Sequence, residues 1–97
     1  MFEAETIDGG EVRLMGRLDA AQAEKAQAFL DQLTGPTRLD LSGLEYISSA
    51  GLGVLLKTQK RLMPVGGVTL TNVNHHIHDI FKYSGFDQIF KIEPASA

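Results

Sequence analysis

Apolar and polar residues alternate over two short segments at the start of the chain. Phe2 to Ile7 and Val12 to Met15 are half-alternating apolar stretches, a pattern typical of strands with one buried face. Asp8-Gly9-Gly10 between them supplies residues that tolerate positive φ at a tight turn. The pattern predicts a β-hairpin.

An amphipathic helix is expected after this hairpin. Asp19 precedes Ala20, and its carboxylate is suited to cap the first turn, with Gln22 answering as the N3 residue of a capping box. Apolar residues then recur at spacings of three and four, and polar residues take the other face. The pattern ends at Gly35-Pro36. The apolar positions are Ala23, Ala26, Leu30 and Leu33.

The rest of the chain alternates strand-like and helical segments. Arg38 to Leu41 predicts a strand, and residues 42–47 predict a loop that leads into a helix from Ser49 to the stop at Pro64. The β-branched run 68–72 predicts another strand. Asn74 is expected to cap a third helix that Gly85 ends, and residues 89–92 predict a last strand.

The order β-β-α-β-α-β-α-β predicts an α/β fold. Strands separated by helices pair in parallel through right-handed crossovers, so we expect a small mixed sheet with an antiparallel opening hairpin, parallel βαβ units and helices packed on it. A chain of 97 residues has room for one core. We predict a single domain over residues 1–97, with 94–97 as a flexible tail.

Composition narrows the possible functions. Nine Lys and Arg against twelve Asp and Glu give a net charge of -3, which disfavours nucleic acid as a partner. The chain has no Cys, which agrees with a reducing cytoplasm and excludes a metal site built on cysteine thiolates. The start of the chain lacks the pattern of an export signal. The longest run without a polar side chain, Ala50 to Leu56, falls far short of the roughly 20 residues that span a bilayer, so we expect no membrane insertion.

The segment around residue 50 has residue types that packing alone does not require. Ser48 and Ser49 stand where a strand ends and a helix begins, and one hydroxyl suffices as an N-cap. Gly51 and Gly53 follow, although each Gly in a helix costs roughly 1 kcal/mol relative to Ala. Small residues allow a partner backbone or a nucleotide-bearing active site to approach closely. Close packing of the helix on the sheet is the alternative explanation.

Three motifs resemble STAS domains, the family of bacterial anti-sigma factor antagonists. They are Gly16-Arg17-Leu18-Asp19, the stretch from Asp40-Leu41-Ser42 to Tyr46-Ile47-Ser48-Ser49-Ala50-Gly51-Leu52-Gly53, and Phe81-Lys82-Tyr83-Ser84-Gly85-Phe86. The resemblance covers nearly the whole chain, and it implies a partner switch. The resemblance implies that the unmodified protein binds a serine-kinase anti-sigma factor and so releases a sigma factor. It also implies that phosphorylation before the second helix ends that binding and that a PPM-type serine phosphatase restores it.

The chain departs from the family pattern at the phosphate acceptor. The family has Asp-Ser-[Ser/Thr]-Gly, and aligning on Gly51 puts Ala50 at the acceptor position. Either Ser49 or Ser48 is the acceptor, with Ser49 favoured, or the protein binds its partner without this control. We expect Ala50, Val54, Lys57 and Arg61 to line the outward face of the second helix. The predicted partner-binding residues are Asp19, Ser48, Ser49, Ala50, Gly51, Gly53, Val54 and Lys57.

Two other functions stay open. STAS subunits of phospholipid transporters also have Ala before this Gly, and they bind an ATPase subunit. A STAS module that senses a small anion or nucleotide at the start of the second helix is the other alternative. No Ser stands in a recognisable nucleophile motif with a His and an acid, so we expect no enzymatic activity, no cofactor and no metal.

Overall fold

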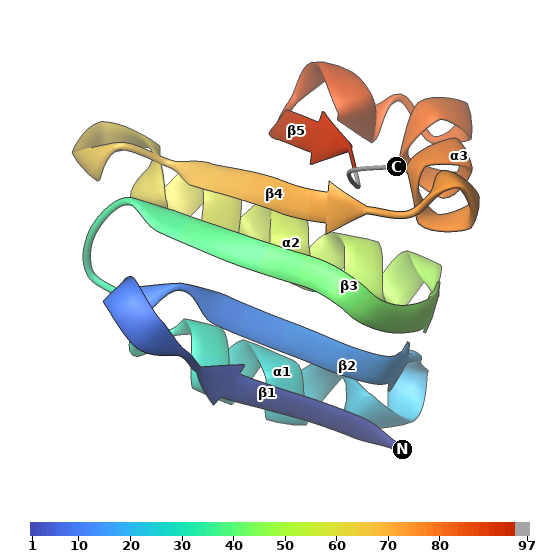
Figure 1. Cartoon of the computed structure of the whole chain (residues 1–97), viewed down its shortest axis with the longest axis horizontal. Coiled ribbons are helices and arrows are strands. Elements are labelled where there is room, and N and C mark those ends of the chain that lie inside the picture. Colours follow the sequence, from blue (N-terminus) through green and yellow to red (C-terminus); the bar gives the residue numbers. More distant parts are fainter. Residues whose placement is uncertain (95–97) are drawn as a thin grey trace.

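A five-stranded mixed sheet organises the protein, and the computed structural model describes residues 1–94 (Figure 1). The strands follow the order β1-β2-β3-β4-β5, with β1 and β2 antiparallel and every other pair parallel. The predicted fold class is confirmed, including the opening hairpin. The strands are β1 (Phe2–Thr6), β2 (Val12–Leu18), β3 (Thr37–Ile47), β4 (Val68–Val73) and β5 (Lys91–Pro94).

Side-chain caps precede the turn that leads into the first α-helix and the third helix. The Asp19 carboxylate accepts a hydrogen bond from the Gln22 amide at 3.2 Å, and the Asn74 side chain accepts one from the Ile77 amide at 2.9 Å. Both caps were predicted. Residues 20–22 form a 3₁₀ turn, however, so the first α-helix begins later than expected, and it ends before Gly35. The helices are α1 (Ala23–Leu30), α2 (Ser49–Leu62) and α3 (His75–Tyr83).

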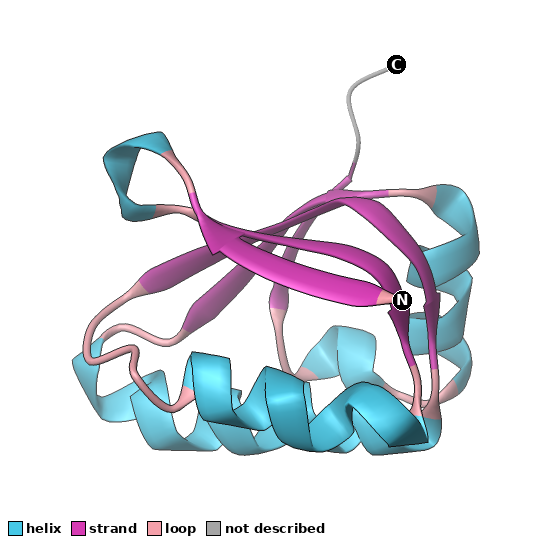
Figure 2. Ribbon diagram, turned by 90° about the horizontal axis from the view of Figure 1, so that it is seen from below, coloured by secondary structure: helices cyan, strands magenta, loops and turns pink. Residues whose placement is uncertain are grey.

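The helices α1 and α2 lie side by side along one face of the sheet (Figure 2). Leu14 and Leu39 from the sheet and Ala26 and Leu55 from the helices are fully buried in the core between these layers. Burial of such side chains is the main source of stability. Among the described residues, no helix has both the length and the apolar character needed to cross a membrane.

Several predicted strand boundaries are wrong, and the first is that of β2, which continues past Met15 to Leu18. Residues 42–47 are not a loop, because β3 continues to Ile47, where it pairs with Leu18 of β2. A bulge around Ser42 breaks the alternation that would have indicated a strand. The last strand is shifted to Lys91–Pro94, after a 3₁₀ turn at residues 86–88. Pro94 pairs with Val73 and so belongs to the sheet, while the rest of the predicted tail, 95–97, lies outside the described residues.

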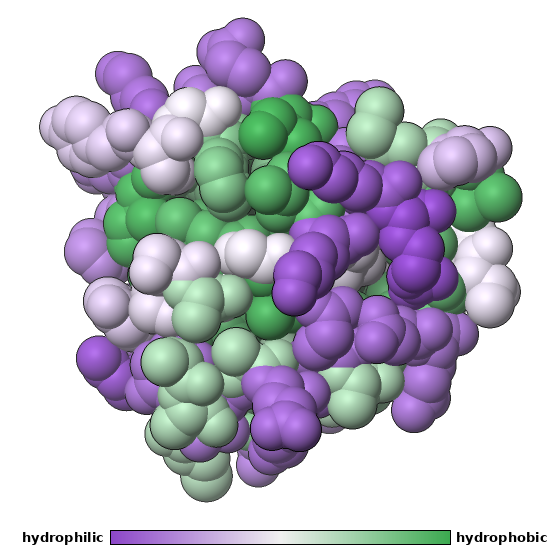
Figure 3. Space-filling view, turned by 180° about the vertical axis from the view of Figure 1, so that it is seen from behind, coloured by the Kyte–Doolittle hydropathy of each residue, from purple (hydrophilic) through white to green (hydrophobic). Residues whose placement is uncertain are grey.

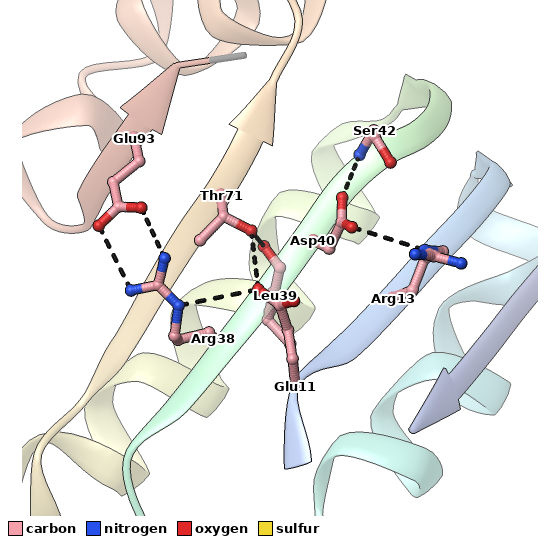
Figure 4. Close-up of polar contacts among 8 residues, drawn as sticks. All are labelled: Glu11, Arg13, Arg38, Leu39, Asp40, Ser42, Thr71 and Glu93. Atoms are coloured by element: carbon pink, nitrogen blue, oxygen red, sulfur yellow. Dashed lines mark hydrogen bonds and ion pairs between the residues drawn. The ribbon is translucent and has the colours of Figure 1, made fainter. Parts of the chain in front are cut away.

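The face of the sheet opposite α1 and α2 carries a network of charges (Figure 4). The Arg38 guanidinium donates to both carboxylate oxygens of Glu93, at 2.6 and 3.3 Å, and lies 3.7 Å from the Glu11 carboxylate. Hydrogen bonding to Arg38 lowers the pKa of the Glu93 carboxyl. The pair joins β3 to the edge strand β5.

Asp40 is the most buried charge of this network, with 5% of the residue exposed. Its carboxylate accepts the Ser42 amide at 2.8 Å and lies 3.5 Å from Arg13 Nε. Burial opposes ionisation, but the hydrogen bonds from Ser42 and Asn72 and the charge of Arg13 outweigh it and lower the pKa of Asp40. The carboxylate thereby holds the bulge of β3 in place.

Candidate functional site

The start of α2 is tied to the end of β2. The Ser48 amide donates to the Leu18 carbonyl at 2.9 Å, and the Ser48 hydroxyl accepts from the Gly51 amide at 3.2 Å. Of the two serines between which the sequence left the N-cap open, Ser48 is therefore the cap, and its side chain is half-buried. Because Leu18 precedes Asp19, these bonds bring the two predicted loop residues Asp19 and Ser48 to the same end of the sheet.

Ser49 occupies the first helical position of α2 and is exposed. Its hydroxyl has no hydrogen-bond partner among residues 1–94. The free amides and positive dipole end of a helix favour negative charge at this position. Of the two adjacent serines, Ser49 thus has the more accessible hydroxyl.

The two glycines of α2 have different roles. A Cβ on Gly51 would lie 2.7 Å from the Leu18 carbonyl oxygen and 2.8 Å from an Ile47 side-chain carbon, so Gly51 is required for close packing on the sheet. A Cβ on Gly53 would meet no atom within 4 Å. The packing explanation therefore holds for Gly51, which is buried, and fails for Gly53, which leaves open space on the outer surface of the helix.

That open space belongs to a shallow groove between α1 and α2. Alanines, Gly53 and Val54 form its apolar part, and charged or polar side chains of both helices border it. In Figure 3, which views the helix side, apolar and weakly polar residues gather in the central part of the face, and hydrophilic residues form a broad area to the right of them. The lining residues are Ala23, Glu24, Gln27, Ala50, Gly53, Val54 and Lys57.

Two residues predicted for the outward face of α2 have other surroundings. Val54 is only 6% exposed and belongs to the core cluster, so it contributes to the groove but is not a free surface side chain. Arg61 donates to the carbonyl oxygens of Leu30 and Leu33, each at 2.8 Å. It thereby gives a second donor to the Leu30 carbonyl, which already accepts from the Leu33 amide at 3.1 Å, and a donor to the Leu33 carbonyl just beyond α1. Arg61 therefore joins two helices instead of facing a partner.

The contribution of α1 to this groove was missed by the sequence analysis. Glu24 and Gln27 follow the polar face of an amphipathic helix, and such positions are usually solvated. Glu24 and Lys57 form no ion pair with each other among residues 1–94, so both charges remain available. Glu24 and Lys57 meet at one groove because α1 packs beside α2. The helical spacing within one segment does not reveal which other helix packs against it.

The described part of the chain contains no cluster of side chains suited to bind a metal ion. No group of three or more His, Cys, Asp or Glu side chains there is placed to hold an ion. His75 lies 3.4 Å from Asp79 on α3, and both are at least partly exposed. The arrangement at the start of α2 therefore offers a hydroxyl, a helix terminus and a groove, which suit modification and docking.

The family model described as "Mlab, STAS domain" matches residues 1–93. BtrV of Bordetella bronchiseptica, provisionally named an anti-sigma factor antagonist, is 39% identical over 92 residues, which cover 89% of this chain and 79% of BtrV. The anti-sigma F factor antagonist of Paenibacillus polymyxa is 32% identical over 89 residues, covering 86% of this chain and 74% of that protein.

Solved structures share the fold. A Thermotoga maritima protein, provisionally described as an anti-sigma factor antagonist, superposes with a TM-score of 0.75 at 25% identity, covering 95% of this chain and 85% of that one. The Bacillus cell fate determinant SpoIIAA, in its phosphorylated form, gives a TM-score of 0.70 at 21% identity, with 99% and 92% covered.

Proposed function

Since this chain belongs to the STAS domain family, we propose that it is an anti-sigma factor antagonist that acts by partner switching. It binds a serine-kinase anti-sigma factor and so releases a sigma factor or another output protein. Its role is reversible binding in the cytoplasm, without catalysis. The names of BtrV and of the Paenibacillus relative support this role.

The observation that carries the proposal is the accessible surface at the start of α2. Ser49 is exposed, and one turn later Gly53 leaves open space where any larger residue would project. A kinase active site can reach such a hydroxyl, and a partner backbone can approach such a glycine. A glycine that costs helix stability and fills no packing need is best explained by contact with another molecule.

Phosphorylation of Ser49 is the proposed control. A phosphate adds roughly -1.5 to -2 charge and considerable bulk. At the first position of α2 the helix dipole stabilises this charge within the protein, while the added group obstructs the surface on which the partner docks. A PPM-type serine phosphatase reverses the modification. Ser48 is the weaker candidate because its hydroxyl already caps the Gly51 amide.

Kinase treatment followed by mass spectrometry tests the control. Incubation with the cognate anti-sigma kinase and ATP is expected to place one phosphate on Ser49, and Ser49→Ala is expected to abolish it. Phosphate on Thr58, which is buried, or on Ser84 would refute the assignment. No phosphate on wild type together with modification of Ala50→Ser at position 50 would show that the loop is accessible and that this chain binds without phosphorylation.

A second candidate function rests on Ala50. STAS subunits of phospholipid transporters share Ala before the corresponding Gly, and they bind an ATPase. This function predicts binding to a transporter ATPase subunit and no phosphorylation by an anti-sigma kinase. Calorimetric titration against both purified proteins separates the two functions, because only the true partner is expected to bind with micromolar or tighter affinity.

A further inference from the structure

We propose that the groove between α1 and α2 receives one amphipathic segment of the anti-sigma factor. The segment presents an apolar side chain to the groove, a basic group to Glu24 and an acidic group to Lys57. This inference rests on the proposed function. It adds that α1 selects the partner as directly as α2 does, whereas the sequence motifs place the contact on α2, its preceding loop and Asp19.

The position of the groove supports docking there. It includes Ala50 and Gly53 and so continues directly from the proposed phosphorylation loop. Beyond Lys57 along α2, Arg61 bridges to the Leu30 and Leu33 carbonyls and to the end of α1. Ala50 and Lys57 are seven residues apart, which corresponds to about 10 Å along a helix. This length accommodates a short segment rather than a large domain face.

The charges bordering the groove specify the polarity of that segment. Glu24 stands in the first turn of α1, and Lys57 stands on α2. Both are exposed, and they form no ion pair with each other within residues 1–94. These two charges favour a partner segment that places a basic group beside Glu24 and an acidic group beside Lys57. This arrangement gives specificity as well as attraction.

Gln27 adds an independent observation. Its amide nitrogen donates to the Asp31 carboxylate at 2.7 Å, which fixes which end of the side chain is the oxygen. Gln27 Oε1 is buried and, in the described part of the chain, has no hydrogen-bond partner. A buried acceptor without a donor is unfavourable. Since Gln27 lines the groove, a small side-chain shift would present this oxygen to a donor on the partner.

Charge reversal provides the test. Isothermal titration of the full chain with the purified anti-sigma kinase is expected to show at least tenfold weaker binding for Glu24→Lys and for Lys57→Glu. Glu3→Lys on β1 and Lys82→Glu on α3 are matched controls, because they change net charge equally at exposed positions away from the groove. Both are expected to bind within twofold of wild type. Equal effects of groove and control variants would overturn the inference.

Gln27→Met separates binding from folding. The substitution keeps the shape of the side chain and removes both the unpaired oxygen and the exposed hydrogen bond to Asp31, so the urea midpoint is expected to change little while affinity falls at least threefold. Unchanged affinity would refute a role for Gln27 in binding. If wild type does not bind the kinase at all, the proposed function fails. If wild type binds and the variants of Glu24, Lys57 and Gln27 bind equally well, the groove assignment is wrong and the proposed function stands.

Discussion

The two glycines of α2 predict opposite effects of the same substitution. Gly51→Ala and Gly53→Ala each add one methyl group and each gain helix propensity, which favours Ala by roughly 1 kcal/mol in a helix interior. At Gly53 the methyl meets open space, so this variant is expected to be more stable than wild type by about that amount.

At Gly51 the same methyl would lie 2.7 Å from a carbonyl oxygen and 2.8 Å from two side-chain carbons. Forcing extra methyl groups into a filled core costs roughly 1 to 3 kcal/mol. Since both variants share the gain in helix propensity, the difference between their unfolding free energies isolates the cost of this contact. We expect the unfolding free energy of Gly53→Ala to exceed that of Gly51→Ala by about 1 to 3 kcal/mol.

Urea unfolding followed by circular dichroism measures the difference. With a slope of about 1 kcal/mol per molar for a small domain, the midpoints are expected to differ by roughly 1 to 3 M. Ala28→Gly, at an exposed position of α1, calibrates the propensity contribution. Equal shifts of the two variants in the same direction would refute the argument that Gly51 serves packing and Gly53 serves the surface.

Three further predictions concern the framework. Arg61→Lys is expected to lower the unfolding free energy by about 1 to 2 kcal/mol, because an ammonium cannot reproduce the forked pair of hydrogen bonds. The control variant Lys60→Ala is expected to change it by less than about 0.5 kcal/mol. Equal urea midpoints of the two variants would contradict this prediction. The lowered pKa of Asp40 contributes stability that is present above the ordinary pKa of an Asp carboxyl and is lost as pH falls through the lower pKa of the folded state. Urea midpoints between pH 6 and pH 3 are therefore expected to fall less steeply for Asp40→Asn than for wild type; parallel curves would contradict this. Asn74→Ala is expected to cost about 1 kcal/mol or more, because it removes the cap and the hydrogen bond that the Asn74 amide nitrogen donates to the Leu44 carbonyl at 3.2 Å. Asn74→Ser keeps a capping oxygen but not this donor, so it is expected to cost less; thermal unfolding distinguishes the two variants, and equal losses would count against the cap.

Local signals in the sequence predicted what local interactions determine. The caps at Asp19 and Asn74 were predicted because a short polar side chain before a helix has one dominant use, whereas the choice of Ser48 over Ser49 as the cap of α2 came only from the structure. The order of strands and helices followed from periodicity, and parallel pairing followed from the connections. The family motifs placed the start of α2 at the centre of the site.

The errors concern contacts between segments far apart in the sequence. The extension of β3 to Ile47 depends on pairing with β2 across the bulge that Asp40 holds, and alternation fails there. Val54 has the spacing of an outward residue but is covered once α1 packs beside α2. Arg61 resembles a solvated cation until the carbonyls at the end of α1 are placed beside it. Tertiary partners of this kind are not encoded in a single segment.

The connections of α1 and α2 have a consequence for association kinetics. The start of α2 is tied by the Ser48 amide to the Leu18 carbonyl, just before α1, and its end is tied by Arg61 to Leu30 and Leu33. A helix pair fixed at both ends needs little reorganisation before a partner binds, so binding loses little conformational entropy. Its association rate is then limited by diffusion and orientation, and differences in affinity among groove variants appear mainly in how fast the complex dissociates.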